Sequence, residues 1–217
     1  MRKQNPKSYE YIESLMTPET ELMEKARAGA KDLGLDTISV SQTEASILKF
    51  LISTNACKKV VEIGTLTGLS ALYILEALPT DGVLWTLEKS AEHIEKASDV
   101  LASEIEKGRC VIVGGDALEK LPTLNSSGPF DAIFIDGNKA AYLKYFDWAL
   151  ENVSAGGLIL VDNIFLAGAV WGDQTLQRFN EKQILNVQTM NKKAFATQGL
   201  TSTVIPTSEG LLVCKKS

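Results

Sequence analysis

The chain has 217 residues, of which 45% are hydrophobic and 23% are charged, and its formal net charge is −5. This length suits one α/β domain with a sizeable core, and the negative charge argues against a general nucleic-acid-binding protein. No apolar run approaches the roughly 18 residues that span a bilayer, and the polar residues 1–6 lack an apolar signal core, so we expect a cytoplasmic protein without a membrane partner.

Cysteine and histidine usage narrows the possible chemistry. Cys57, Cys110 and Cys214 lie far apart in apolar segments, which predicts buried, reduced thiols. His93 is the single histidine, so the sequence argues against a His-based catalytic triad and against a zinc site with several histidines. We expect His93 to be a solvated helix residue.

The first 40 residues form an N-terminal helical segment in our interpretation. Residues 8–34 have helical character, with Thr17 and Pro18 as a start and Gly34 as a stop. Ser41 is followed by glutamate three residues later, which is the capping-box pattern and predicts a second helix.

Strand-like and helix-like segments then alternate. Strands are expected at 59–63, 83–87, 110–113, 130–135 and 157–161, and helices at about 71–75, 90–107, 140–152 and from about 174. A final hairpin joins strands 201–205 and 210–214 through Pro206–Glu209. This order predicts a mostly parallel sheet with right-handed crossovers, helices on both faces and an antiparallel edge, in one domain covering residues 1–217.

The stretch from Val60 to Ser70 is the centre of the predicted site. It passes from a continuous apolar run through Gly64 and Gly68 into a helix, which is typical of a buried parallel strand, a tight turn and a helix start. Glycine permits the sharp turn and a close approach of a ligand, and the first helical N–H groups can bind a polar group. The turn has neither a G-K-[ST] motif nor a G-x-G-x-x-G motif, which favours a nucleoside over a pyrophosphate-bearing ligand.

Polar residues follow five consecutive predicted strands. They are Glu62 with Gly64, then Glu88, Asp116, Asp136, and Asp162 with Asn163. Because ligands of open α/β sheets bind at the carboxyl ends of the strands, these groups should converge on one crevice. Glu88 suits the acidic residue that binds a ribose diol. Any one of these carboxylates could instead only cap the next helix.

Asp136, Asp162 and Asn163 form a second candidate set. Two carboxylates and a side-chain amide suit Mg²⁺, Mn²⁺ or Ca²⁺ better than zinc. Lys139 should lie near the same place. The alternative is that these residues cap helices or bond locally, with Lys139 solvated.

Three segments resemble one protein family: Glu62–Ser70, Phe130–Tyr142 and Gly156–Asn163. They look like those of the cation-dependent O-methyltransferases, which include catechol and caffeoyl-CoA O-methyltransferases. The resemblance runs from about Ser41 to Cys214. It implies a Rossmann-like, seven-stranded fold of the S-adenosylmethionine-dependent methyltransferases and, as assembly, a homodimer.

The resemblance also implies residue roles. Glu62, Gly64, Ser70, Glu88, Asp116, Ala117 and Asp136 would surround S-adenosylmethionine, with Glu88 at the ribose hydroxyls and Asp116 and Ala117 at the adenine. Asp136, Asp162 and Asn163 would bind the divalent cation, and Lys139 would be the general base. The expected function is methyl transfer to a hydroxyl of a catechol-like or caffeoyl-type aromatic acceptor.

Residues 1–40 match the family poorly. In the family this region helps to shape the acceptor pocket, so the resemblance implies that the N-terminal segment contacts the acceptor or a second subunit.

Two local departures also concern the acceptor. The family usually has Asp-Ala-Asp-Lys where this chain has Asp136-Gly137-Asn138-Lys139, and often Gly-Asp-Gly where this chain has Ser208-Glu209-Gly210. They leave open a methyltransferase with a non-catechol acceptor. A non-catalytic S-adenosylmethionine-binding protein and an NAD-dependent dehydrogenase are the further alternatives.

The loop after Asn163 is too apolar for a free loop. Residues 164–172 should form a pocket wall or a subunit contact. Within this loop, Trp171 is expected to line the acceptor site, to pack internally or to contact another subunit.

Overall fold

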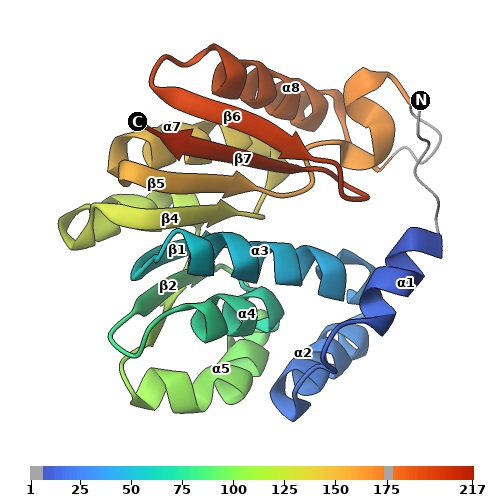
Figure 1. Ribbon diagram of the computed structural model, residues 1–217, viewed down its shortest axis with the longest axis vertical. Coiled ribbons are helices and arrows are strands. Elements are labelled where there is room, and N and C mark those ends of the chain that lie inside the picture. Colours follow the sequence, from blue (N-terminus) through green and yellow to red (C-terminus); the bar gives the residue numbers. More distant parts are fainter. Residues whose placement is uncertain (1–6, 174–177) are drawn as a thin grey trace.

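Seven strands form one sheet in the order β3-β2-β1-β4-β5-β7-β6 (Figure 1). The structure is a computed structural model and describes residues 7–173 and 178–217. The strands are β1 (Lys59–Ile63), β2 (Val83–Glu88), β3 (Cys110–Gly114), β4 (Phe130–Ile135), β5 (Val153–Val161), β6 (Leu200–Ile205) and β7 (Leu211–Lys216). The first five are parallel, and β7 pairs antiparallel with both β5 and β6. The expected fold class is confirmed.

Helices cover both faces of the sheet (Figure 1). The α-helices are α1 (Lys7–Ser14), α2 (Glu21–Asp32), α3 (Gln42–Thr54), α4 (Leu69–Ala77), α5 (Ala91–Glu106), α6 (Ala117–Lys120), α7 (Tyr142–Asn152) and α8 (Glu181–Ala196). The short 3-10 helices are η1 (Asp36–Ile38), η2 (Leu121–Ser127), η3 (Lys139–Ala141) and η4 (Leu166–Trp171). None of the helices within the described ranges is long and apolar enough to cross a membrane.

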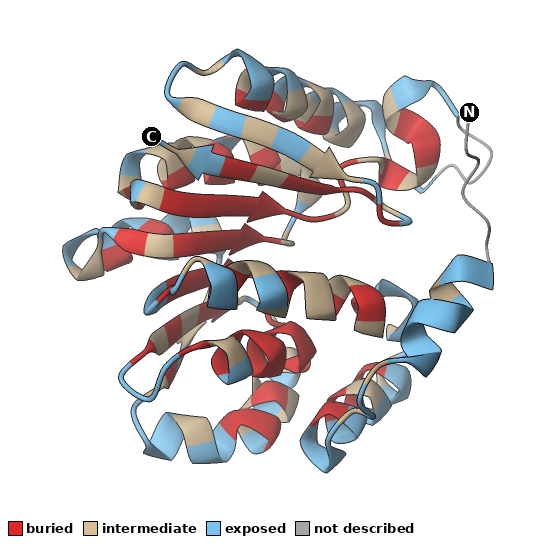
Figure 2. Ribbon diagram, viewed as in Figure 1, coloured by how far each residue is buried: buried red, intermediate tan, exposed pale blue. Residues whose placement is uncertain are grey.

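Two hydrophobic cores form because successive strand residues point to opposite faces. Val60 of β1 belongs to the core under α2–α5, whereas Val61 belongs to the core under α7 and α8. Phe134 and Ile135 of β4 divide in the same way. Figure 2 shows β4 and β5 buried along most of their length. Burial on both faces explains why the parallel strands have unbroken apolar sequences.

The N-terminal helical segment differs in detail from the prediction. It forms two helices, α1 and α2, and the Thr20 side chain caps α2 by accepting the Met23 N–H at 3.4 Å. Thr17 and Pro18 lie in the connection between the helices, so the predicted helix start was wrong. Gly34 follows α2 with a φ of 69°, which agrees with the predicted stop.

The other expected elements lie close to their predicted positions. Ser41 and Glu44 form the capping box of α3, and the Ser90 side chain caps α5. The predicted helix start near 174 lies outside the described residues, and α8 is capped by Asn180. All three cysteines are buried and free, and burial raises the pKa of Cys57 to about 11.

Candidate active site

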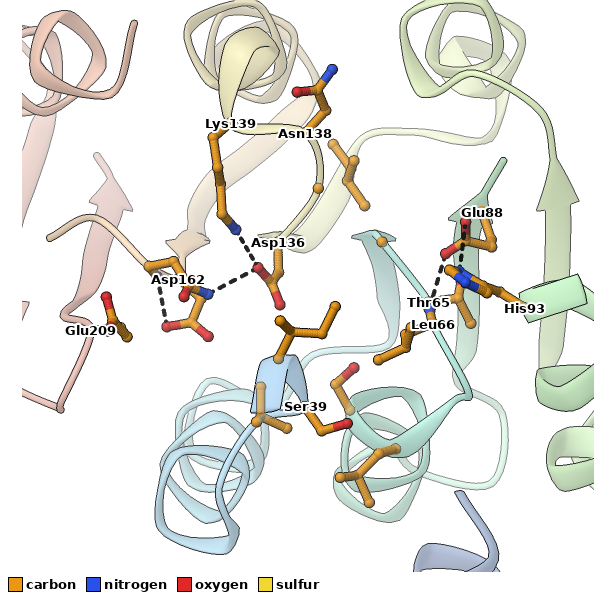
Figure 3. A pocket seen from close by; sticks show the side chains of 18 of the residues that line it. Ser39, Thr65, Leu66, Glu88, His93, Asp136, Asn138, Lys139, Asp162 and Glu209 are labelled. Atoms are coloured by element: carbon orange, nitrogen blue, oxygen red, sulfur yellow. Dashed lines mark hydrogen bonds and ion pairs between the residues drawn. The ribbon is translucent and has the colours of Figure 1, made fainter. Parts of the chain in front are cut away.

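A cleft of about 820 Å³ lies at the carboxyl ends of the parallel strands. In Figure 3, Glu88 and His93 lie at one end, Asp162 and Glu209 lie at the other, and Asp136 lies between them. The cleft therefore has a Glu88 end and an Asp162 end. The predicted convergence of the strand ends on one crevice is what the structure shows.

The turn between β1 and α4 forms the floor near the middle of the cleft. Gly64 has a φ of 104°, and a Cβ atom there would collide with the backbone carbonyl of Asp136. Gly68 caps α4 with a φ of 89°, and Ser70 in the first turn of this helix is 9% exposed. Glycine at 64 therefore lets the ends of β1 and β4 lie side by side.

Glu88 is held at the end of β2 by backbone donors. Its Oε1 atom accepts the N–H groups of Lys89 at 2.8 Å and Ser90 at 2.9 Å, and its Oε2 atom accepts the Leu66 N–H at 3.0 Å. The His93 Nδ1 atom is 3.5 Å from Glu88 Oε1, and both side chains line the cleft (Figure 3). His93 is thus not the solvated residue that the sequence predicted. His93 follows the cap Ser90 by three residues, so it lies on the first turn of a helix that starts at the cleft. This position in the sequence could have predicted that His93 lines the cleft.

Asp116 and Ala117 also line the cleft at the Glu88 end. Asp116 caps the short helix α6, and its Oδ1 atom accepts the Leu118 N–H at 2.9 Å. The helix-capping alternative therefore holds for this residue, and it remains beside the ligand space as well.

Glu62 lies beneath the cleft, outside its lining. It is fully buried, and its Oε2 atom accepts the Thr86 hydroxyl at 2.6 Å, while Thr86 also bonds Thr65. Burial raises the pKa of Glu62 to about 7, although the Ser70 and Thr86 hydroxyls lower it. The Oε1 atom of Glu62 accepts no hydrogen bond of normal geometry from any described residue. Glu62 thus supports the turn from below, and Thr65 and Ser70 connect it to the cleft, which both of them line.

Asp136 is the central acceptor of the Asp162 end. Its Oδ1 atom accepts Lys139 Nζ at 2.7 Å and Asn163 Nδ2 at 3.0 Å (Figure 3). Lys139 also donates to the Tyr142 hydroxyl and lies 4.7 Å from the centre of that ring. Burial raises the pKa of Tyr142 well above its usual value, so this hydroxyl stays protonated and donates to the Asp162 carbonyl at 3.1 Å. The structure thus brings Asp136, Lys139 and Asn163 together, and Tyr142 was missed because its predicted helix position gave no indication of its direction.

Asp162 is the more buried of the two carboxylates, with 5% exposure. Burial, and then the charges of Asp136 and Glu44, raises its pKa well above the usual value. Its Oδ1 atom accepts the N–H of Asn163, which has a left-handed φ of 60°. A buried carboxylate whose pKa is raised partly by a neighbouring carboxylate is an environment that a bound cation would relieve.

The donor set therefore fits a hard divalent cation by its chemistry. It consists of two carboxylates and one amide, and no group of three or more His, Cys, Asp or Glu side chains is arranged as a metal site within the described ranges. The Asn163 amide nitrogen faces Asp136 here. A rotation of the amide would turn its oxygen toward the same place.

A second wall of the Asp162 end consists of two segments that the sequence did not predict to meet. Ser39 and Glu44 from the N-terminal side, and Ser208 and Glu209 from the β6–β7 turn, line the cleft. The Ser39 hydroxyl is buried without a partner among the described residues. The capping box and the hairpin were recognisable in the sequence, but their meeting depends on the tertiary fold.

The apolar loop after Asn163 packs rather than extends freely. Leu166 and Ala169 are buried, and Trp171 stacks edge-on against Phe165 with ring centres 5.3 Å apart. Trp171 is 64% exposed and is not among the described residues that line the cleft. The prediction of a pocket wall is therefore met by Ala167 of this loop, which does line the cleft.

Comparisons with known proteins agree with this geometry. A sequence profile of the family described as O-methyltransferase matches residues 13–217. Catechol O-methyltransferase of Niastella koreensis is 34% identical over 77% of this chain and 76% of its own length, and that of Mycobacterium tuberculosis is 30% identical over 85% and 90%. Caffeoyl-CoA O-methyltransferase of Eucalyptus gunnii is 29% identical over 96% and 86%.

Solved structures have the same fold. The O-methyltransferase TomG of Streptomyces achromogenes, a protein of tomaymycin synthesis solved in complex with S-adenosylmethionine, superposes with a TM-score of 0.87 at 29% identity, covering 95% of this chain and 94% of that one. An O-methyltransferase of Bacillus cereus, solved with S-adenosylhomocysteine, gives a TM-score of 0.85 at 25% identity, with 96% of each chain covered. The profile match spans nearly the whole chain, the fold agrees, and the cleft lies where an open α/β sheet binds its ligands. The chain therefore belongs to the O-methyltransferase family, a family of S-adenosylmethionine-dependent enzymes whose fold it shares.

Proposed function

We propose that this protein transfers the methyl group of S-adenosylmethionine to a hydroxyl of a catechol-like or caffeoyl-type aromatic acceptor, with a divalent cation held by Asp136, Asp162 and Asn163. The observation that carries the proposal is the meeting of these three side chains beside Lys139, next to a cleft long enough for a second ligand. The names of the relatives support the acceptor class.

The cofactor fits the Glu88 end of the cleft. Gly64 lines the cleft, and Glu88 presents a carboxylate fixed by three backbone N–H groups. Such a carboxylate can accept the two hydroxyls of a ribose, with Asp116 and Ala117 beside the base.

The remaining chemistry belongs to the Asp162 end. S-adenosylmethionine supplies an electrophilic methyl group, and the cation, when bound, supplies Lewis acidity that favours the deprotonated acceptor hydroxyl. Lys139 Nζ takes the hydroxyl proton, for which the amine must be neutral, and the Tyr142 hydroxyl orients it. Asp136, Asp162 and Asn163 position the acceptor oxygens, because the rate of an in-line transfer depends on alignment.

A methyl-transfer assay with catechol and with a caffeoyl thioester, each with Mg²⁺, with Mn²⁺ and with EDTA, tests the proposal. We expect turnover that EDTA abolishes and added cation restores. Asp162→Asn should lower kcat on the order of 100-fold or more through lost positioning. Asp147→Asn, which removes an exposed carboxylate paired with Lys193 at 2.8 Å, is the matched control and should keep the activity.

Each part of the proposal can fail separately. Full activity in EDTA would contradict the cation. Turnover of other hydroxyl compounds, but of neither test acceptor, would identify a non-catechol methyltransferase. Cofactor binding without transfer to any acceptor would identify a binding protein. The homodimer and the cytoplasmic location remain predictions.

A further inference from the structure

A hydrogen bond crosses the Asp162 end of the cleft between two segments that are far apart in the chain. The Ser208 hydroxyl, in the turn between β6 and β7, donates to Glu44 Oε1 at 3.0 Å, across a sequence separation of 164 residues. We propose that this Ser208–Glu44 bond, called the tie below, fixes the width of the Asp162 end, which is the acceptor end of the cleft. The tie thereby selects small aromatic acceptors over bulky ones. The inference rests on the proposed function for the identity of the acceptor.

Glu44 is a rigid partner for the tie. Its other oxygen, Oε2, accepts the Ser41 backbone N–H at 3.0 Å and the Ser41 hydroxyl at 2.9 Å as part of the capping box of α3. The carboxylate is therefore fixed on both oxygens. It lines the cleft, and its charge is one of those that act on Asp162, so the tie lies beside the expected reaction centre.

The turn is anchored on its opposite side as well. Glu209 Oε2 accepts the Ala167 N–H at 2.8 Å, and the Glu209 carbonyl accepts the Phe165 N–H at 2.9 Å. A Cβ atom on Gly210 would lie 2.8 Å from the Phe165 ring, so the turn and the loop are in close contact. The turn thus joins the loop after Asn163 to the N-terminal wall, and it cannot move independently of the loop.

A second bond joins the N-terminal side to this turn. It runs from the Tyr9 hydroxyl to the Pro206 carbonyl and is longer, at 3.4 Å, and exposed. Glu44 itself stays held by the capping box of α3, so without the Ser208 hydroxyl the turn, together with the loop after Asn163, should be able to move away from Glu44. The acceptor end would then widen, so a small acceptor would be held less well and a bulky one would be admitted.

Ser208→Ala is the test, assayed with catechol and with a caffeoyl thioester at saturating cofactor and cation. We expect the KM for catechol to rise about three- to tenfold, the range of one ordinary hydrogen bond, because this bond is exposed to solvent, and the preference for catechol over the thioester to fall by a similar factor. The kcat for catechol and the Kd for S-adenosylmethionine should change less than about twofold, because no group at the Glu88 end is altered. A general loss of structure would instead lower kcat and cofactor affinity together.

Two further variants serve as controls. Thr207→Val removes the neighbouring hydroxyl, which is buried and has no partner among the described residues, and should behave as wild type. Ser208→Thr keeps a hydroxyl at the position and should retain the wild-type preference. If Ser208→Ala matches Thr207→Val in KM and in preference, or if Ser208→Thr behaves like Ser208→Ala, the inference is overturned.

A measurement without turnover separates this inference from the proposed function. In a double-mutant cycle of urea unfolding with Ser208→Ala and Glu44→Ala, we expect the two effects to be non-additive by about fivefold in the folding constant. Additive effects would disprove the tie. Coupled effects in a protein that methylates neither acceptor would keep the tie and contradict the proposed function.

Discussion

Glu62 illustrates how a single buried group makes the stability of this protein depend on pH. Its pKa is about 7 in the folded protein, mainly because of burial, against an ordinary value of 4.5. At a pH well below 4.5, Glu62 is protonated in both the folded and the unfolded protein. Between the two values the unfolded chain loses its proton while the folded protein keeps it, so the free energy of unfolding falls as pH rises and then levels off above 7.

Glu62→Gln should remove this dependence, because an amide keeps an acceptor for Thr86 and carries no charge. We expect the free energy of unfolding of the variant, relative to wild type, to rise by up to about 3 kcal/mol between pH 4.5 and 7. Urea unfolding of both proteins without cofactor at pH 4.5, 6 and 7.5 would measure it. A difference that stays constant with pH would show that folding does not raise the pKa of Glu62 above its ordinary value of 4.5.

The site residues that the sequence predicted share one property. Gly64, Glu88, Asp136, Asp162 and Asn163 all lie at or just after the ends of strands, and parallel strands bring their carboxyl ends to one edge whatever the details of packing. The direction of a helical side chain such as His93 depends on how its helix packs on the sheet. The depth of Glu62 beneath the turn depends on the same packing. Sequence periodicity does not specify how helices pack on a sheet, so these features became visible only in the structure.

At the scale of elements, the β1–α4 turn depends on two separate requirements at Gly64. The position has a left-handed φ of 104°, and a side chain there would collide with the end of β4. Gly108, after α5, shares only the first requirement, because its φ is 70° and a Cβ atom there would have no neighbouring atom within 4 Å. A comparison of Gly64 with Gly108 therefore separates the effect of backbone strain from the effect of a steric clash.

Gly64→Ala should be much more damaging than Gly108→Ala. We expect about 1 kcal/mol of destabilisation for Gly108→Ala from the φ alone, and at least about 3 kcal/mol for Gly64→Ala because β1 and β4 must move apart. The same variant should lose affinity for S-adenosylmethionine. Thermal unfolding measures the destabilisation, and titration calorimetry measures the affinity for the cofactor. Equal destabilisation by the two substitutions would mean that the end of β4 can move away from residue 64 at little cost in free energy.

The elements themselves were largely predictable, with one instructive failure. Ser41 and Ser90 cap their helices as predicted, because a cap needs only a local side chain and an N–H three residues on. Thr17 and Pro18 have the same local pattern, yet α2 begins later, after the cap Thr20. Glu19 bonds Arg27 and Tyr73 there, so a tertiary contact overrides the local signal.

At the scale of the whole molecule, that same contact attaches the N-terminal segment. Arg27 binds both oxygens of Glu19 and donates to the Val40 carbonyl at 3.1 Å, next to the cleft wall. Burial acts to raise the pKa of Glu19, but the hydrogen bonds from Arg27 and Tyr73 lower it overall. The carboxylate is therefore ionised and paired where α2 meets α4.

Arg27→Met should loosen this segment rather than unfold the sheet. Loss of the partly buried pair should cost roughly 1–3 kcal/mol, discounted because the Arg27 side chain is 34% exposed. We expect faster hydrogen exchange in residues 21–44 and little change in β1–β5. Tyr73→Phe, which removes one hydroxyl from the same carboxylate, is the milder control. Uniformly faster exchange would show that the segment is part of the global unfolding unit.

The place of β7 in the sheet also affects how the protein forms during synthesis. β7 lies between β5 and β6, so the strand translated after all the others belongs in the interior of the sheet. Until β7 has emerged from the ribosome, the edge of β5 has no partner and is open to other chains. The Glu88 end of the cleft can assemble on β1–β4 during translation. The Asp162 end depends on Ser208, so it cannot assemble until β7 and the turn before it have been made. A nascent chain could thus hold its cofactor before it can recognise what to methylate.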